Sequence, residues 1–424
     1  MRVLLINDNS AHPNWGAQAT PFALRRILQR SVPGVEIEAI PWDWLRYRYR
    51  RLQVPLLGRL LWREDTLRAL RPVLMRTSRY TDFFPHVADD FDAFADDWLA
   101  GRGGPQAREF LEFAEAARVI VYNGENSIYG NTLEGCHGLF LLWLAKTRLG
   151  KPSCIVNHTA QLDSFRPIMS GMVRLVYPVL DLVAVREPCS LENLQALGIT
   201  NAEPFPDVVF AQDPNEFARE RVEEWRRQRG LDSQAYFCLS ASGLPVSMPN
   251  ENWDGEVAAL VRDLKASGLQ AVLVAKDPWC LPLEEVARRT DSLFFGPENE
   301  FHDLWPLFES ASFLVSGHYH YVIFGAMVGC PFIPLSANNH KMRGVCEHLE
   351  WHRTVPFDAT FLRSCRAEIV EEARRLQENR SGLSARLLER SAAFRDEARR
   401  LGARVAEAAQ RAEHAATPSS GANL

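Results

Sequence analysis

Short apolar runs of strand length alternate along this chain with segments in which apolar residues recur at helical spacing. Such alternation is typical of parallel sheets whose successive strands are joined by helices. It therefore predicts an α/β fold with two doubly wound domains. The expected strands are 3–6, 35–40, 119–122, 154–157, 182–185, 236–239, 271–275, 293–295, 313–316 and 332–335, and the expected helices include 18–29, 139–149, 190–197, 217–227 and 257–266.

The length of 424 residues is too great for one hydrophobic core and indicates more than one domain. We place the join at the Pro- and Asp-rich stretch 204–213, which separates an N-terminal domain over 1–205 from a C-terminal domain over 206–357. Beyond this second domain the composition shifts to Ala, Glu, Arg and Leu, which predicts amphipathic helices over 358–415. The last segment, 416–424, is expected to be a flexible tail.

Composition and motifs argue against several functional classes. A charged content of 24% and a net charge of −5 are ordinary for a globular protein and argue against general affinity for nucleic acid. No apolar run approaches the roughly 20 residues that span a bilayer. Eight cysteines without CxxC spacing suit a reducing compartment, so we expect a cytoplasmic protein without a metal site. The motifs GxxxxGKS/T, GxSxG and HExxH are missing.

One region differs in composition from the rest of the chain. Residues 45–80 carry ten arginines against two acidic residues, with tyrosines, leucines and a tryptophan between them. A basic amphipathic segment of this kind can lie on the anionic inner face of a membrane or take a phosphorylated, lipid-linked substrate. The alternative is a solvated helical insertion whose arginines pair with the acidic stretch 82–97. Peripheral membrane contact through 45–80 is therefore a hypothesis.

The turn after the expected strand 313–316 carries two histidines, His318 and His320, at the start of an apolar helical pattern. Such a turn lies at the carboxyl edge of a parallel sheet, where open α/β folds bind ligands, and the helix start offers unpaired N–H groups to an anion. Asn339 and Lys341 follow the next strand on the same edge. We expect these side chains to converge on a phosphate or carboxylate, although histidines near a helix start are also common surface residues.

Two turns in the N-terminal half also place polar side chains after an expected strand. Asn14 and Trp15 follow the first expected strand, and Asn123, Glu125 and Asn126 follow the third. A carboxylate just past a strand end, such as Glu125, can act as a base in a site at this edge. A role in the turn itself is the more ordinary interpretation of each residue taken alone.

Arg186 directly follows the expected strand 182–185. A guanidinium there could clamp a carboxylate or phosphate through two parallel hydrogen bonds. A salt bridge within the protein is the alternative role for this residue.

In order and spacing these segments resemble the polysaccharide pyruvyl transferase family over about residues 1–350. The C-terminal segment of that family reads roughly SGRxH, an apolar helix, GxP and a later HK. This chain reads SGHYH, an apolar helix, GCP and a later HK. The other matching residues are Asn14-Trp15-Gly16, Asn123-Gly124-Glu125, Val185-Arg186-Glu187 and Pro206-Asp207.

The resemblance implies a GT-B-like pair of Rossmann-like domains with the ligands between them. The N-terminal domain would form the acceptor side and the C-terminal domain the donor side. The resemblance also implies phosphoenolpyruvate as co-substrate, no further cofactor, and a sugar or lipid-linked oligosaccharide as acceptor. Transfer of the pyruvyl group to two hydroxyls of that acceptor would form a cyclic ketal.

The resemblance further implies roles for individual residues. His320 would donate a proton or contact the phosphate, Glu125 would deprotonate a sugar hydroxyl, and Arg186 would hold the donor during catalysis. His318 departs from the family, which usually has arginine there, and an imidazole cannot give the bidentate clamp of a guanidinium. The donor-binding set is Arg186, His318, His320, Asn339 and Lys341, and the acceptor-binding set is Asn14, Trp15, Asn123 and Asn126.

Two other functions stay open on the sequence alone. One is a glycosyltransferase that uses a nucleotide sugar in a GT-B-type site, since a fold does not determine a function. The other is a non-catalytic binding protein that kept the fold and lost the donor site, which the histidine at position 318 makes credible.

Overall fold

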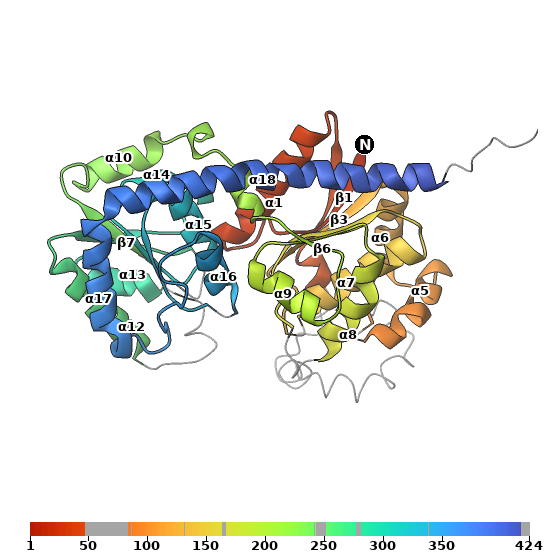
Figure 1. Cartoon of the computed structure of the whole chain (residues 1–424), viewed down its shortest axis with the longest axis horizontal. Helices are drawn as coiled ribbons and strands as arrows, with labels where there is room; N and C mark the ends of the chain where they lie inside the picture. Colours follow the sequence, from red (N-terminus) through yellow and green to blue (C-terminus); the bar gives the residue numbers. More distant parts are fainter. Residues whose placement is uncertain are drawn as a thin grey trace, which may run out of the picture.

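The computed structural model describes residues 1–46, 84–85, 87–130, 132–162, 167–240, 242, 252–276, 280, 282–337 and 339–416. Within these residues it contains two parallel β-sheets, each with helices on both faces (Figure 1). The predicted α/β fold is therefore confirmed. The Arg-rich segment 45–80 lies outside the described residues except for its first two positions, and so does the expected tail after residue 416.

The N-terminal sheet consists of β1 (Arg2–Asp8), β2 (Glu36–Pro41), β3 (Val119–Glu125), β4 (Ser153–His158), β5 (Leu182–Val185) and β6 (Ala202–Pro204). Its strand order is β2-β1-β3-β4-β5-β6, and its pairings are parallel. Val3 and Leu5 of β1 face one core, whereas Leu4 and Ile6 face another. Successive side chains point to opposite faces, so the continuous apolar run of β1 reflects a strand covered on both sides.

The C-terminal sheet consists of β7 (Tyr236–Ser240), β8 (Gln270–Val274), β9 (Leu293–Phe295), β10 (Leu314–Ser316) and β11 (Phe332–Pro334). Its strand order is β11-β10-β7-β8-β9, again with parallel pairings. In both sheets the chain first adds strands on one side of the sheet's first strand and then adds the remaining strands on its other side. This creates a switch point between β1 and β3 and another between β7 and β10.

Each of the ten expected strands overlaps an observed strand. The strand that was not predicted is β6, which has the sequence Ala-Glu-Pro and lies at the edge of its sheet. None of its three residues is buried. An exposed edge strand needs no apolar run, so no periodicity marks it in the sequence.

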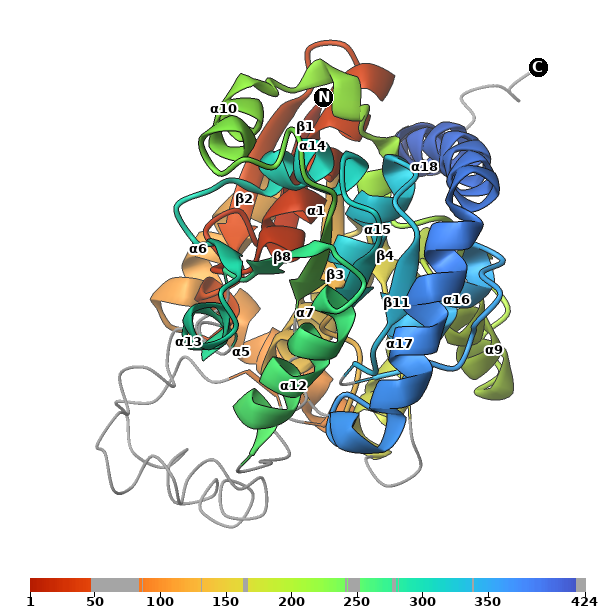
Figure 2. The ribbon, with the colours of Figure 1, turned by 90° about the vertical axis from the view of Figure 1, so that its left-hand side faces the viewer.

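The helices of the N-terminal domain are α1 (Trp15–Ser31), α5 (Phe91–Leu99), α6 (Pro105–Ala116), α7 (Leu133–Thr147), α8 (Pro167–Val176) and α9 (Pro188–Ala196), with the short 3-10 helices η1 (Trp44–Arg46), η2 (Ala88–Asp90) and η3 (Tyr177–Val179). Along the chain, η4 (Val208–Ala211), η5 (Pro214–Glu216) and α10 (Glu220–Gln228) come between the strands of the first sheet and those of the second. The C-terminal domain adds α12 (Trp253–Lys265), α13 (Pro282–Arg289), η6 (Phe301–Asp303), α14 (Leu304–Glu309), α15 (Tyr319–Met327) and α16 (Lys341–His348). Then follow α17 (Leu362–Glu378), which lies beside α12 (Figure 2), and α18 (Arg380–Ala416).

Helix α18 joins the two domains. It has 37 residues, which corresponds to about 55 Å of helix. Figure 1 shows it running along both domains, and it contacts α15 on one side and α1, β3, β4 and β5 on the other.

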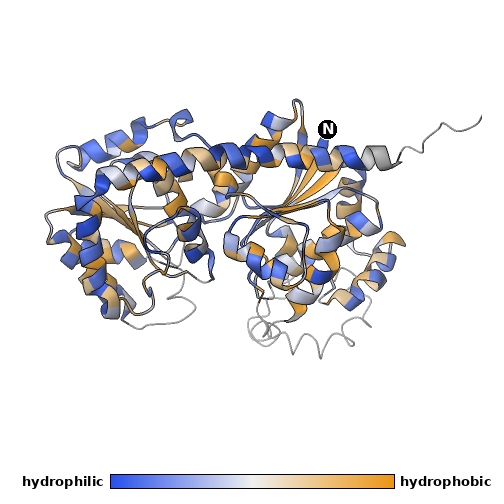
Figure 3. Ribbon diagram, viewed as in Figure 1, coloured by the Kyte–Doolittle hydropathy of each residue, from blue (hydrophilic) through white to orange (hydrophobic). Residues whose placement is uncertain are grey.

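One hydrophobic core consequently extends from the first sheet into the second. It contains residues of β1 and β3 together with residues of β7, β8 and β10, and it includes α1 and α18. In Figure 3 the strands of both sheets are mainly hydrophobic, whereas the outer helices carry many hydrophilic residues. Among the helices of the described ranges, none has both the length and the apolar character needed to cross a membrane.

Candidate active site

Residues from both domains meet at the carboxyl ends of the two sheets. Glu125 ends β3, Arg186 follows β5, and His320 lies in the first turn of α15, just after β10. Asn339 and Lys341 lie at the start of α16, after β11. These positions lie close to the two switch points, where open α/β sheets bind their ligands.

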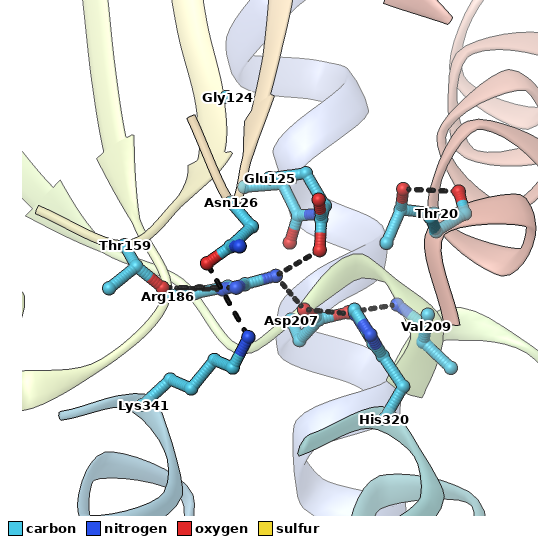
Figure 4. Close-up of polar contacts among 12 residues, drawn as sticks. Thr20, Gly124, Glu125, Asn126, Thr159, Arg186, Asp207, Val209, His320 and Lys341 are labelled. Carbon is cyan, nitrogen blue, oxygen red and sulfur yellow. Dashed lines mark hydrogen bonds and ion pairs between the residues drawn. The ribbon is translucent and has the colours of Figure 1, made fainter. Parts of the chain in front are cut away.

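A chain of alternating charges crosses the domain boundary (Figure 4). Arg186 Nη1 lies 3.9 Å from Glu125 Oε1 and 2.9 Å from Asp207 Oδ2. His320 Nε2, from the C-terminal domain, lies 3.4 Å from the same Asp207 oxygen. The order is carboxylate, guanidinium, carboxylate, imidazole, so a potential base and a potential acid are linked through two buried charges.

The guanidinium of Arg186 is enclosed by protein groups. Its Nε donates to Glu187 Oε1 at 2.8 Å, its Nη1 to Asp207 Oδ2 at 2.9 Å and its Nη2 to Thr159 Oγ1 at 3.0 Å. The ring of Tyr319, from the C-terminal domain, covers its face, with 4.4 Å between the guanidinium carbon and the ring centre. The Arg186 side chain has 0% of its surface exposed.

This geometry corrects the role predicted for Arg186. A residue that clamps a ligand must direct two N–H groups at it, but Arg186 directs its N–H groups at partners within the protein. Buried carboxylates need such a partner, and Arg186 holds Glu187 and Asp207. Its position therefore suits the orientation of these carboxylates and not direct contact with a donor anion.

Glu125 is the most exposed of the three carboxylates around Arg186, with 13% of its side-chain surface accessible. Burial acts to raise the pKa of Glu125, but the charges of Arg186, His320 and Lys341 outweigh it and the pKa is lowered from 4.5. The carboxylate is therefore ionised at neutral pH, which is the form a base requires.

His320 lies between the two domains with 8% of its side-chain surface exposed. Its Nε2 has no hydrogen-bond partner among the residues that the structure describes. The other ring nitrogen, Nδ1, lies against α1, where a Cβ on Gly16 would be only 2.2 Å away. Glycine at position 16 is thus required for this approach, while Nε2 is buried and faces Asp207.

Replacing Gly16 by alanine is expected to destabilise the protein by about 1–3 kcal/mol, because the new methyl group overlaps the His320 ring. Gly171→Ala is the matched control: this helical glycine has nothing within 4 Å of an added Cβ. The control is expected to stabilise the protein by about 0.4–1 kcal/mol. Urea unfolding measures both changes, and shifts of the same sign and size would contradict the close packing at Gly16.

Asn126, Asn339 and Lys341 form a second contact between the domains. Asn339 Nδ2 donates to Asn126 Oδ1 at 2.9 Å, and Lys341 Nζ lies 3.4 Å from the same oxygen. All three residues are partly exposed. The structure thus brings together residues predicted for the acceptor and donor sides, and their ligand contacts stay predictions.

His318 differs from the charged residue that an anion site needs. Its Nε2 lies 3.3 Å from Cys280 Sγ, and its ring centre lies 4.8 Å from that of Tyr321. Burial, together with the nearby charges of Lys341 and His320, lowers the pKa of His318 to about 3. The imidazole is therefore neutral at neutral pH and offers no positive charge to a donor, and its place in the donor-binding set stays a prediction.

The turn after β1 serves the fold. Asn14 caps α1, since its side chain accepts a hydrogen bond from Ala17 N at 3.0 Å. Trp15 is fully buried, with its ring centre 5.8 Å from that of Tyr321 and its Nε1 donating to Asn299 O at 3.0 Å. The prediction that Trp15 contacts the acceptor is therefore wrong, because the indole packs inside the shared core.

Asn123 is also buried. It has 0% exposure, and its Nδ2 donates to Thr20 Oγ1 at 3.2 Å, while its carbonyl oxygen accepts from Asn7 Nδ2 at 2.6 Å. These bonds join β3 to β1 and α1. A direct contact between Asn123 and the acceptor is excluded in this conformation, whereas the partly exposed Asn14 and Asn126 stay candidates.

Reasoning from the sequence missed Gly16, Asp207 and Glu187 as members of this site. Each stands in a segment that carries the family resemblance, but nothing in the sequence indicates that they contact Arg186 or His320. An arginine at a strand end with a carboxylate beside it, as in Arg186-Glu187, was the one available sign of a buried ion pair.

Two Rossmann-like domains with a polar cluster at their facing carboxyl edges define a protein of the GT-B-like fold class. A family model for polysaccharide pyruvyl transferases matches residues 14–339. The chain therefore belongs to the polysaccharide pyruvyl transferase family, a family of transferases. No curated protein matches it in a sequence search.

Solved structures show the same fold. The Anabaena protein HepE in complex with UDP superposes with a TM-score of 0.53 and 13% sequence identity, covering 98% of this chain and 99% of that one. The UDP-GlcNAc 2-epimerase from Methanocaldococcus jannaschii has a TM-score of 0.51 and 14% identity over 88% of this chain and 92% of its own. These identities are low, so the likeness concerns the GT-B-like fold.

Proposed function

We propose that this chain transfers a pyruvyl group from phosphoenolpyruvate to two hydroxyls of a polysaccharide or lipid-linked sugar, forming a cyclic ketal. Membership in the family supports this proposal. The observation that carries it is the series of contacts that links Glu125, an ionised carboxylate, through Arg186 and Asp207 to the imidazole of His320. These two residues come from different domains, as expected where a donor and an acceptor meet.

In the first step, His320 gives a proton to the methylene carbon of phosphoenolpyruvate, which becomes a methyl group. Positive character develops at the adjacent carbon, which bears the phosphate. A sugar hydroxyl oxygen bonds to that carbon while Glu125 takes the hydroxyl proton. The product is a tetrahedral adduct that carries phosphate, carboxylate, methyl and sugar oxygen.

In the second step, the bond between this carbon and the phosphate oxygen breaks, and phosphate leaves with the electron pair. A second hydroxyl of the same sugar bonds to the carbon and closes the ketal. Of the two hydroxyl protons, one restores the proton that His320 gave and the other leaves with phosphate. The reaction thus balances without an oxidant or reductant.

Lys341 supplies the positive charge for the donor in this proposal. Arg186 is neutralised by carboxylates, and His318 is uncharged at neutral pH. Lys341 lies beside Asn126 and lowers the pKa of Glu125, so its ammonium group is close to the reacting centre. A phosphate or carboxylate next to it would gain a charge-assisted hydrogen bond.

Phosphoenolpyruvate is expected to raise the Tm of the protein, and phosphate release should follow when a suitable sugar is added. Saturation at about 100 times Kd corresponds to roughly 2.7 kcal/mol of stabilisation. Lys341→Ala should lose this shift, because the donor loses its ammonium partner. Arg343→Ala is the matched control on the same helix, since Arg343 pairs with Glu347.

Two outcomes would contradict the proposal. Stabilisation by UDP and not by phosphoenolpyruvate would indicate a nucleotide-sugar glycosyltransferase instead. Absence of any shift with either ligand would indicate a binding protein that has lost its donor site.

A further inference from the structure

We propose that a cluster of four arginines, where α1, α18, η4 and η5 meet, binds a phosphate group. Figure 1 shows α18 passing along α1, and both helices contact η4. The two helices approach closely at Gly402 of α18, where an added Cβ would lie 2.8 Å from the Ile27 carbonyl oxygen. The cluster shares no side chain with the candidate active site, so this proposal does not rest on the proposed function.

Each helix supplies two arginines that are one turn apart. Arg26 and Arg30 are four residues apart on α1, and Arg395 and Arg399 are four residues apart on α18. Residues with this spacing lie on the same face of a helix, and like charges at this spacing repel each other. The two pairs therefore need negative charge from elsewhere.

Among the described residues, two carboxylates pair with this cluster, and both come from the segment that carries η5. Glu216 pairs with Arg26 and also with Arg30, whose Nη2 lies 2.9 Å from its Oε1. Arg395 Nη1 lies 3.2 Å from Asp213 Oδ2. The side chains of these three arginines are between 25% and 38% exposed, so a ligand from solution can reach them.

Arg399 has no carboxylate at ion-pair distance in the part of the chain that the structure describes. Its Nε donates to the carbonyl oxygen of Ala211 at 3.1 Å, and Arg30 Nη1 lies 3.5 Å from the same oxygen. Burial and the positive charges of Arg30 and Arg395 lower the pKa of Arg399. Arginine still stays charged at neutral pH, so Nη1 and Nη2 of Arg399 can donate two parallel hydrogen bonds to an anion.

The charges of the cluster do not balance. Four guanidiniums face the carboxylates of Asp213 and Glu216, which leaves an excess of two positive charges. Asp396, an exposed residue of α18, also acts on Arg399, and counting it leaves an excess of one. A phosphate monoester carries about 1.5–2 negative charges at neutral pH and compensates this excess more fully than a single carboxylate. Its oxygens also match the fork of a guanidinium.

The test measures the binding of inorganic phosphate to the whole chain by calorimetry, with sodium chloride keeping the ionic strength constant. Arg399→Gln should weaken phosphate binding by about tenfold or more, because charge-assisted hydrogen bonds are lost. Arg400→Gln is the matched control, since it removes the same charge from a neighbouring side chain that is 72% exposed and lies 3.8 Å from Glu397. The control should bind phosphate within about twofold of the wild type.

A phosphate group can belong to a soluble molecule or to a lipid headgroup, and sedimentation with vesicles separates these sources. Vesicles of phosphatidylcholine with phosphatidic acid are compared with vesicles of phosphatidylcholine alone. Sedimentation of the wild type with the acidic vesicles, lost in Arg399→Gln and kept in Arg400→Gln, indicates a lipid headgroup. Binding of inorganic phosphate without sedimentation indicates a soluble phosphorylated molecule.

Several results would overturn the proposal. One is equal weakening in Arg399→Gln and Arg400→Gln, and another is a wild type that binds neither phosphate nor acidic vesicles. Weakening in Lys341→Ala but not in Arg399→Gln would place the phosphate at the candidate active site instead. If Arg399→Gln does not fold, Arg30→Gln on α1 is compared with Arg400→Gln in the same way. The measurements need neither phosphoenolpyruvate nor a sugar, so this site and the proposed function can fail separately.

Discussion

Replacing Arg186 by methionine is expected to lower the free energy of unfolding by about 3–5 kcal/mol, because two fully buried carboxylates lose their partner. Methionine approximates the length of the arginine stem, so the expected loss of stability comes from the missing charge more than from the missing side-chain volume. The face of the Tyr319 ring also loses its cation, which weakens the contact between the domains. Urea unfolding of the whole chain measures the change.

Arg2→Met is the matched control for this prediction. Arg2 pairs with Glu36 at 3.1 Å, but the two side chains are 50% and 71% exposed. Water and salt screen such a pair, so its loss should cost no more than about 1 kcal/mol. A loss in Arg186→Met as small as that of the control would contradict the view of Arg186 as the centre of a buried ion cluster.

The same variant should change how stability depends on pH. Burial acts to raise the pKa values of Glu125 and Asp207, but nearby charges outweigh it and lower them from 4.5 and 3.8. A carboxylate whose pKa is lower in the folded state adds stability above its unfolded pKa and loses it as the pH falls through the folded value. The wild type should therefore lose stability on acidification below about pH 4.5, and Arg186→Met should lose less over the same range.

Replacing Glu125 by glutamine is expected to lower kcat by about 10²–10⁴-fold with little effect on folding, because the amide cannot accept the hydroxyl proton. Glutamine keeps the shape and one oxygen that can face Arg186. On the acidic side, the activity of the wild type should hold down to about pH 4.5 and fall below it, where the carboxylate becomes protonated. Initial rates of phosphate release over a pH series measure both effects.

Glu203→Gln provides the comparison for Glu125. Glu203 lies on β6 of the same sheet and pairs with Arg404 of α18. Its replacement should leave kcat unchanged. A rate in Glu125→Gln within threefold of that of Glu203→Gln would remove Glu125 from the mechanism.

Much of the fold could be predicted from the sequence. The ten expected strands are present because strands covered on both faces need continuous apolar runs, and such runs are visible without a structure. β6 was missed because an exposed edge strand has no such run. The positions of Glu125 and Arg186 at the carboxyl edge of one sheet, and of His320 at that of the other, also followed from the sequence, since the parallel strands of a sheet all end on the same side.

The burial, the ionisation and the partners of the site residues could not be predicted in the same way. The sequence shows Arg186 at a strand end but not that Asp207 and Tyr319 enclose it. It shows His318 but not the burial and neighbouring charges that keep it neutral. It likewise shows Trp15 in a polar turn, although the indole is buried against the other domain.

The sequence by itself determined the α/β class, the order of strands and helices and the family resemblance, because these depend on local periodicity and on motifs within short segments. Only the tertiary structure decided which charges pair, which side chains are buried and which nitrogen of His320 faces Asp207. The physical reason is that ionisation and access depend on neighbours that are distant in the chain, as when Asp207 meets Arg186 and His320 across a domain boundary.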